Sequence, residues 1–277
     1  MKTKTLWISQ VLSELVFVLA GLAGVAVIVA ISITWHHLAW QKMRSMGPTP
    51  LSTEMLLMAE LALALWFWAR LTQSWWHQHR AIRHLFQQLA PVLEPLPFAD
   101  QAGLTKANQW FISPDNERYA FSMGIFSPMV IISNGLWNSL TASQRRAVCY
   151  HEYHHILAHD PLRQSIIQSI THAVPLPPFH ALFRHYIALR EIRADAFAIR
   201  AANGDFTALA EAMLVATSKQ STALPLPGWS ESLESRIDYM AKGTVPMDGR
   251  RLWAHTATSP LLALALTVGQ GIIFWCH

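Results

Sequence analysis

Three long apolar runs constrain this chain more than any other feature of its sequence. Val11 to Trp35 holds one charged residue, Glu14, over about the length that a bilayer crossing requires. Leu51 to Ala69 and Ser259 to Cys276 are further runs of the same kind, and Glu60 in the second needs either a proton or a wet cavity. Only 14% of the 277 residues are charged, whereas soluble domains average roughly 25%. The sequence therefore predicts a mainly α, multi-pass membrane protein with three transmembrane helices.

The charges that flank these runs predict how the chain is oriented. Basic residues precede the first run, separate the first two and follow the second, namely Lys2, Lys4, Lys42, Arg44, Arg70, Arg80 and Arg83. The positive-inside rule then favours a cytoplasmic N terminus. We predict two spans in residues 1–70, a cytoplasmic domain in 71–258 and a last span in 259–277. No nucleic-acid surface is expected, and the two distant cysteines predict neither a disulfide nor a thiolate metal site.

Local patterns in the cytoplasmic domain predict a short β element followed by a helix. Phe121 to Gly135 is rich in aromatic and β-branched residues between glycines, which is typical of a strand or hairpin that enters a turn. Thr141 and Gln144 have the spacing of a capping box. The helix should run from Ala142 to His159 and stop at Pro161.

The second half of that helix carries the motif H-E-x-x-H at His151, Glu152 and His155. Positions i and i+4 share one helix face, so both imidazoles can reach one metal ion. Glu152 can hold and deprotonate a water that the metal acidifies. Composition alone gives about 0.03 chance matches to this motif, so its presence is informative. The sequence predicts one zinc ion, with Glu152 as the catalytic base.

A hydrolytic zinc site needs a third protein ligand, and the best donor lies in the segment ALREIRADAFAIR. Glu191 and Asp195 are again four residues apart on a predicted helix. Glu191 can complete the metal site, while Asp195 can accept the N–H of a ligand histidine and fix its tautomer. A surface helix with salt bridges to Arg190 and Arg193 is the alternative for this segment taken alone.

The stretch between these motifs, residues 161–190, is too short for the two crossings that would return the chain to the same side of the membrane. Pro175, Pro177 and Pro178 should break it into two short helices that dip into or lie against the bilayer. His172 and His180 are expected at the membrane interface rather than in the site.

Other polar residues have roles that the sequence leaves open. His154 and His159 are predicted to support the ligands or face solvent, and Asp160 either holds a basic or histidine partner or is an ordinary turn residue. The strand near Met129 to Ser133 could pair with an extended substrate. Three further residues are named as candidates for transition-state stabilisation: Arg236, Tyr239 and His255.

The segments GIFSPMVIISNGL, HEYHHILAHDPL and EIRAD together resemble the BlaR/MecR-type membrane zinc metallopeptidases. These are antirepressor proteases of bacterial β-lactam signalling, related to HtpX-type and CAAX-processing proteases. The resemblance covers about residues 119–200 and continues at ESRIDYMAKG. It implies a zincin-like α+β protease domain with a short β-sheet or hairpin. The roles it implies are metal ligation by His151, His155 and Glu191, catalysis by Glu152 and support by Asp195.

These features predict a zinc-dependent, membrane-embedded endopeptidase of a bacterial cell membrane. We expect its substrate to be a protein or peptide, such as a transcriptional repressor in signal transduction. No lysine follows a serine by three positions, so no penicillin-binding sensor domain is expected. One alternative is an HtpX-like protease for membrane protein quality control. Another is a non-proteolytic zinc-binding signalling protein, which the intact Glu152 disfavours because structural zinc sites are usually closed by four protein ligands.

Overall fold

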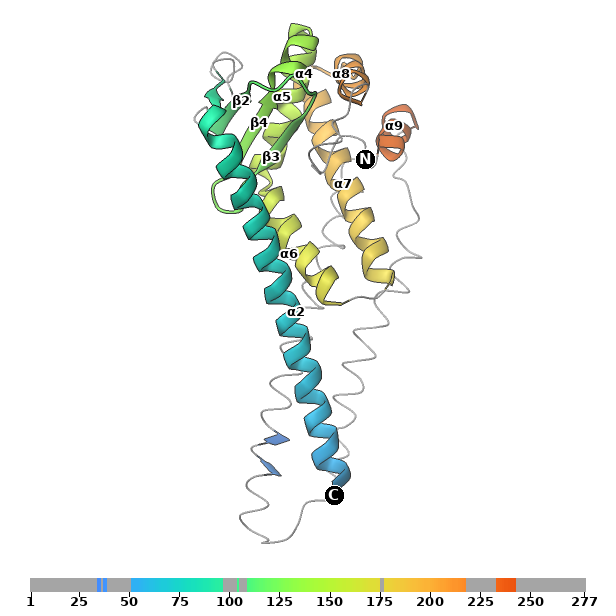
Figure 1. Ribbon diagram of the computed structural model, residues 1–277. Coiled ribbons are helices and arrows are strands. Elements are labelled where there is room, and N and C mark those ends of the chain that lie inside the picture. Colours follow the sequence, from blue (N-terminus) through green and yellow to red (C-terminus); the bar gives the residue numbers. More distant parts are fainter. Residues whose placement is uncertain are drawn as a thin grey trace. The chain divides into compact units, whose positions relative to one another are not determined.

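The structure is a computed structural model that describes residues 34–35, 37–38, 51–96, 104, 109–174, 177–217 and 233–242 (Figure 1). The chain divides into two compact units, each described here by itself. Unit 1 comprises Met1–Gln10, His77–Ile166 and Arg184–Met247, and unit 2 comprises Val11–Trp76, Ile167–Phe183 and Asp248–His277. The spans predicted at residues 11–35 and 259–276 lie outside the described residues, except for Thr34 and Trp35.

Unit 1 contains a four-stranded mixed sheet with the strand order β1-β2-β4-β3. The strands are β1 (Glu94–Pro95), β2 (Trp110–Ser113), β3 (Ala120–Met123) and β4 (Met129–Ser133). β4 pairs in parallel with β2 and antiparallel with β3, and β1 pairs antiparallel with β2. Of the two alternatives predicted between Phe121 and Gly135, a strand or a hairpin, the structure has the hairpin, formed by β3 and β4. Residues 110–113, which had not been assigned a strand, provide the parallel neighbour.

β4 lies inside the sheet, between β2 and β3, and both of its faces are buried. Val130 and Ile132 belong to one hydrophobic cluster, whereas Ile131 belongs to another that contains Phe121. Since alternate side chains point to opposite faces of a sheet, a strand covered on both faces needs an unbroken apolar run, which MVIIS supplies. The prediction that β4 could pair with a substrate is wrong, because β2 and β3 already occupy both of its edges. Among the described strands, β3 is at the edge beside β4.

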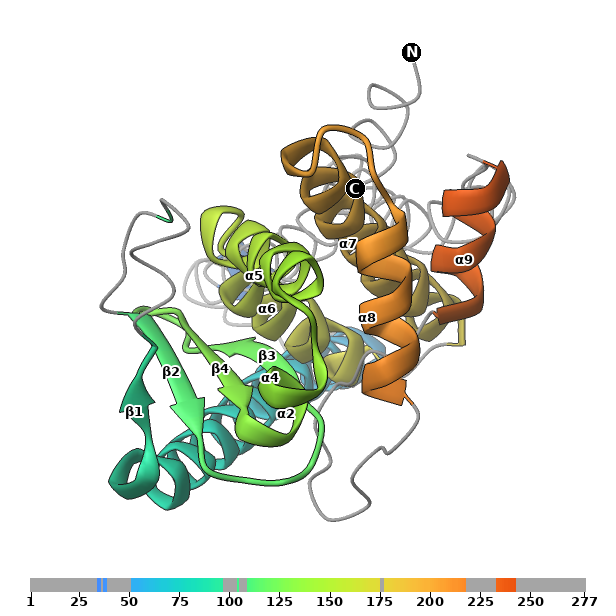
Figure 2. The same ribbon diagram turned by 90° about the horizontal axis from the view of Figure 1, so that it is seen from above.

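Helices cover both faces of the sheet (Figures 1 and 2). The face with Trp110 and Val130 packs against α5 (Ala142–Leu157) and α8 (Thr207–Thr217). The opposite face packs against the C-terminal turns of α2 (Leu51–Leu89), through Ile82, Leu85 and Leu89. The 3-10 turn η1 (Ala90–Val92) then leads into β1. Unit 1 also contains α4 (Asn134–Ser139), the part of α7 (Pro177–Ala201) from residue 184, and α9 (Leu233–Lys242).

The predicted capping box of α5 is present. Gln144 N donates to Thr141 Oγ1 at 3.4 Å, and Thr141 N donates to Gln144 Oε1 at 2.9 Å. The helix ends at Leu157 rather than at His159, whose φ of 54° lies in the left-handed region. Pro161 does more than stop α5, because it lies in the first turn of α6 (Asp160–Ala173). Proline is favoured there since the first N–H groups of a helix have no intrahelical acceptor.

Asn134 and Gly135 begin helix α4 instead of forming the turn that was predicted after the strand or hairpin. Ser133 caps α4 by accepting a hydrogen bond from Leu136 N at 3.2 Å. A Cβ atom on Gly135 would lie 2.1 Å from the carbonyl oxygen of Asn116. Glycine is therefore needed for this close backbone approach.

The longer described segments of unit 2 are helical. They are α2 up to Trp76, α6 from Ile167 and α7 up to Phe183. The break that the prolines predicted is present between Ala173 and Pro177, although α7 continues to Ala201 and is not short. His172 Nδ1 lies 3.1 Å from Ser74 Oγ, and His172 and His180 are both exposed. Leu51 to Ala69 is helical as predicted. No helix in the described ranges is both long and apolar enough to span a membrane, so the predicted span there is unsupported.

Candidate metal centre

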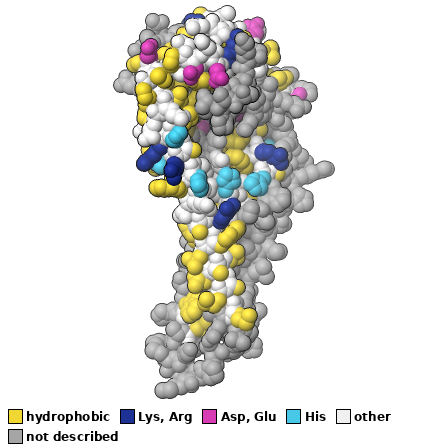
Figure 3. All heavy atoms as spheres, in the orientation of Figure 1, with side chains coloured by type: hydrophobic (Ala, Val, Ile, Leu, Met, Phe, Trp, Pro, Cys, Tyr) yellow, Lys and Arg dark blue, Asp and Glu magenta, His cyan; other side chains and the backbone are white. Residues whose placement is uncertain are grey.

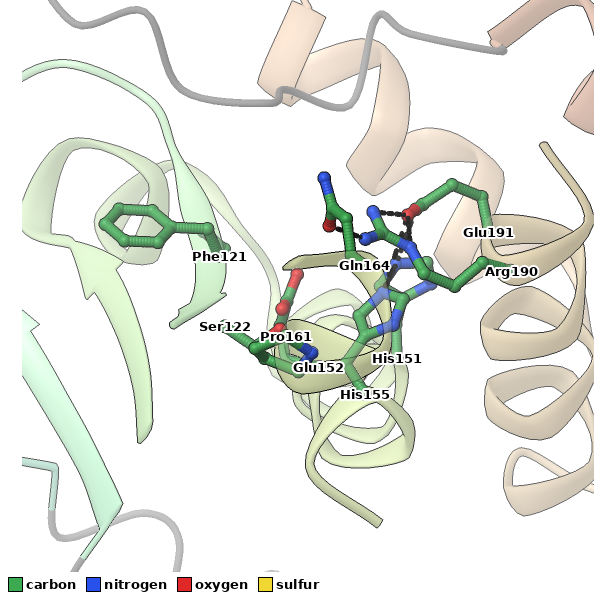
Figure 4. A pocket seen from close by; sticks show the side chains of 10 residues that line it. Phe121, Ser122, His151, Glu152, His155, Pro161, Gln164, Arg190 and Glu191 are labelled. Carbon is green, nitrogen blue, oxygen red and sulfur yellow. Dashed lines mark hydrogen bonds and ion pairs between the residues drawn. The ribbon is translucent and has the colours of Figure 1, made fainter. Parts of the chain in front are cut away.

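Three buried side chains of unit 1 bring their donor atoms together (Figure 4). His151 Nε2 lies 3.2 Å from His155 Nε2 and 3.3 Å from Glu191 Oε2. The other carboxylate oxygen, Glu191 Oε1, lies 3.7 Å from His155 Nε2. Two donors at about 2.0–2.1 Å from a tetrahedral zinc ion are separated by about 3.3 Å. These three residues therefore fit one ion of that size, as the spacing of the two motifs predicted.

Each imidazole directs Nε2 toward this group because a carboxylate holds its Nδ1. Asp195 Oδ1 lies 2.9 Å from His151 Nδ1, and Asp160 Oδ2 lies 2.7 Å from His155 Nδ1. Histidines that bind metals usually donate their second N–H to such a carboxylate, which fixes the tautomer. The predicted contact of Asp195 with a histidine is present. Of the two roles left open for Asp160, the structure supports contact with a histidine rather than an ordinary turn residue.

Arg236 of α9 donates hydrogen bonds to Asp195, the partner of His151. Its Nε and Nη2 atoms donate to Asp195 Oδ2 and Oδ1 at 2.8 and 2.6 Å, and its Nη1 lies 3.6 Å from Glu191 Oε2. Burial alone would raise the pKa of Asp195, but the Arg236 guanidinium outweighs burial and holds that pKa below its usual value. Asp195 therefore stays ionised and can accept the His151 N–H. Arg236 is not among the described residues that line the pocket, and its contacts are with Asp195 and Glu191. Its role at the transition state stays a prediction.

Glu191 has a separate partner in Arg190. Arg190 Nε and Nη2 donate to Glu191 Oε1 at 3.0 and 2.5 Å, and Arg190 Nη1 donates to Gln164 Oε1 of α6. Burial alone would raise the pKa of Glu191, but Arg190 and His155 outweigh it and hold the pKa well below its usual value. Arg190 had suggested a surface helix, yet its side chain is only 12% exposed. Arg190 holds Oε1 of Glu191, while Oε2 of Glu191 faces His151.

Protonation of His151 competes with metal binding. Burial alone would lower the pKa of His151, but the hydrogen bonds to Asp195 and Glu191 outweigh it and raise the pKa to about 9. A metal ion requires the neutral imidazole, so metal binding at neutral pH displaces a proton from this residue.

Glu152 lies beside the two imidazoles and faces the pocket. It is 2% exposed, and its Oε2 atom has no hydrogen-bond partner among the described residues. Burial raises the pKa of Glu152, although nearby His151 and His155 lower it in part. Figure 4 shows its carboxyl group between strand β3 and the imidazoles. The carboxylate is therefore available to a water or substrate that enters from the side of β3.

The family comparison agrees with this geometry. The family model described as Peptidase family M48 matches residues 83–221, about half of the chain. The chain belongs to peptidase family M48. Membership supports a metallopeptidase function, and the match includes every residue of the centre described above except Arg236. No curated protein and no solved structure matches the chain.

The pocket of this M48 peptidase has two chemically different walls. One wall is β3, which contributes Ala120, Phe121 and Ser122. The other is polar and is formed by the H-E-x-x-H residues together with Pro161, Gln164, Arg190 and Glu191. A bound chain would thus lie between a strand edge and the candidate metal ligands.

The structure describes one of the two remaining candidates, Tyr239, which is not among the described residues that line the pocket. Tyr239 packs against Leu189 and Ile192, and burial raises its pKa. His255 lies outside the described residues. His159 is exposed, as one of its predicted roles required.

Sequence reasoning missed Gln164 and underestimated Asp160 and Arg190. The pair Asp160-Pro161 is a recognised helix start, with an acid and a proline in the first turn. Reading it as such would have placed Asp160 at the junction of two helices, next to the end of α5. Arg190 and Gln164 carry no comparable signal, because their contact depends on how α6 and α7 pack.

Proposed function

We propose that the chain is a zinc-dependent endopeptidase that hydrolyses peptide bonds. The convergence of His151, His155 and Glu191, with Glu152 beside them in a pocket, is the observation that carries this proposal. Two histidines and one glutamate form a ligand set of hydrolytic zinc sites, which keep a further position open. When bound there, zinc would act as a Lewis acid toward the scissile carbonyl and lower the pKa of water.

Glu152 is the proposed general base and acid. Its carboxylate accepts a proton from the attacking water and then donates a proton to the nitrogen of the leaving amine. Burial raises the pKa of Glu152, and a carboxyl group that both accepts and releases a proton works best when its pKa is near the working pH. Asp195 and Asp160 keep the two imidazoles in the tautomer that leaves Nε2 free for the ion.

β3 is the proposed docking edge for the substrate backbone. It is the edge strand beside the H-E-x-x-H residues, and Ala120, Phe121 and Ser122 line the pocket. An extended peptide can add to such an edge through main-chain hydrogen bonds. Because a peptide bound in this way is held by its backbone, side-chain preferences come from the rest of the pocket.

We further propose that the peptidase acts at a bacterial membrane, with its catalytic domain in the cytoplasm. Support comes from large exposed apolar side chains on α2: Met55, Met58, Leu63, Leu65, Trp66 and Trp68. Figure 3 shows hydrophobic side chains, in yellow, on the face of this helix that is in view. Exposed basic residues follow along the same helix at Arg70, Arg80 and Arg83. An apolar patch followed by basic residues fits a lipid surface. The BlaR/MecR resemblance favours a regulatory substrate such as a repressor, and the HtpX relationship favours damaged membrane proteins.

A Glu152→Gln variant tests the enzymatic proposal. Purified variant protein should bind zinc as the wild type does but cleave peptides about 10²–10⁴-fold more slowly, the usual contribution of a general base. Glu94→Gln is the matched control, because Glu94 is an exposed carboxylate on β1. Full cleavage by Glu152→Gln would remove the proposed mechanism. Peptides that disappear from cells carrying this variant, found by mass spectrometry, would distinguish a repressor from membrane proteins.

A further inference from the structure

A second group of potential metal donors adjoins the first centre. His154, His155 and Asp160 each offer one donor atom, and these atoms lie within 4.8 Å of one another. His155 belongs to both groups, because its Nε2 faces Glu191 and its Nδ1 faces Asp160. The two groups thus lie on opposite edges of one imidazole ring.

Two atoms of this second group are buried without a hydrogen-bond partner among the described residues. They are Nδ1 of His154 and Oδ1 of Asp160. Leaving a buried polar atom unsatisfied costs about 1–3 kcal/mol, so such atoms in a native site call for an explanation. The His154 ring is held in place by Phe197 of α7, at a centroid separation of 5.4 Å. A preordered imidazole and a carboxylate oxygen with spare acceptor capacity are suitable ligands for a cation.

The donor types select the class of ion. Imidazole nitrogen with carboxylate oxygen suits Zn²⁺, Co²⁺, Ni²⁺ and Cu²⁺ better than Mg²⁺ or Ca²⁺, which prefer oxygen-only sites. We propose that His154, His155 and Asp160 form a second, weaker transition-metal site whose occupation inhibits the peptidase. Its weakness follows from competition, because His155 Nδ1 and Asp160 Oδ2 already contact each other at 2.7 Å and an ion there must separate them.

Inhibition follows from the shared residues. An ion at the second site takes the Asp160 carboxylate away from His155 Nδ1, 2.7 Å away in the structure. Loss of such a supporting hydrogen bond typically costs 10–100-fold in metal affinity or activity. Excess zinc would therefore weaken the centre that one equivalent of zinc activates. The binding part of this proposal stands alone, whereas the inhibition part rests on the proposed peptidase function.

Metal stoichiometry of the purified full-length protein tests the binding part. Equilibrium dialysis with Zn²⁺, and absorption spectra during Co²⁺ titration, should show one tight and one weaker equivalent for the wild type. His154→Phe keeps an aromatic ring against Phe197 but removes the nitrogen donors, and it should bind the tight equivalent only. His159→Asn is the matched control, because His159 is an exposed neighbour whose left-handed φ asparagine tolerates. It should keep both equivalents.

The outcomes are distinct. A single equivalent in the wild type, a second equivalent that persists in His154→Phe, or loss of the second equivalent from both variants would overturn the site. If the site binds, wild-type cleavage should fall tenfold or more between the first and second equivalents, relative to its own maximum. His154→Phe should show no such fall. Equal inhibition of both proteins would overturn the regulatory role, and failure of every metal state to cleave peptides would instead count against the proposed function.

Discussion

Replacing Arg236 by methionine tests how the candidate centre is supported. The side chain of Arg236 is fully buried and makes two hydrogen bonds to Asp195, at 2.8 and 2.6 Å. Arg236→Met would leave the buried Asp195 carboxylate with the His151 imidazole as its main remaining partner. Breaking a buried ion pair from one side usually costs about 3–5 kcal/mol. We expect a loss of this size in the free energy of unfolding of the metal-free protein, and zinc binding about 10–100-fold weaker.

A double variant separates this explanation from a role of Arg236 at the transition state. Adding Asp195→Asn to Arg236→Met removes the uncompensated charge, so the double variant should be more stable than the sum of the single losses by about 0.5–3 kcal/mol. Urea unfolding followed by circular dichroism measures each free energy. Arg200→Met, an exposed arginine of α7, is the control and should change stability by less than about 0.5 kcal/mol. Additive losses, or slower cleavage with unchanged stability and zinc affinity, would refute the reasoning.

Three further predictions follow from the structure. Dialysis against a chelator should abolish cleavage and lower the Tm. The reason is that an ion at 100 times its Kd stabilises the folded state by about 2.7 kcal/mol. A Tm that is the same with and without the chelator would argue against the centre. Gly135→Ala should destabilise by about 1–3 kcal/mol or more, because its Cβ would meet Asn116 O at 2.1 Å. Urea unfolding measures this loss, and a Gly135→Ala variant as stable as the wild type would contradict the close backbone approach. In the metal-free protein the pKa values of Asp160 and Asp195 lie below the usual value. Their stabilisation should therefore be complete above about pH 4 and lost as pH falls through the folded pKa values, so a Tm independent of pH from 6 to 2 would contradict the ion pairs.

The sequence predicted the helix that carries the motif because its signals are local. Thr141 and Gln144 define its start, and the spacing of His151 and His155 depends only on helical geometry. Glu191 and Asp195 followed the same logic, since a zinc site needs a third ligand and a ligand histidine needs a partner.

The remaining features depend on contacts that no local pattern encodes. The parallel pairing of Trp110 with Val130 joins segments that are distant in sequence, so the interior position of β4 could not be read from MVIIS alone. Arg236 lies 41 residues after Asp195, and its guanidinium could as well have entered the pocket as turned behind the carboxylate. Pro161 was misjudged for a different reason, because the rule that proline ends helices was applied without the rule that it begins them.

The position of α9 has a consequence for the nascent protein. Arg236 leaves the ribosome after His151, His155, Glu191 and Asp195 have already emerged. Until then Asp195 lacks the guanidinium that holds its pKa below the usual value. The support of the candidate metal centre is therefore complete only after α9 has been synthesised and has packed against Asp195.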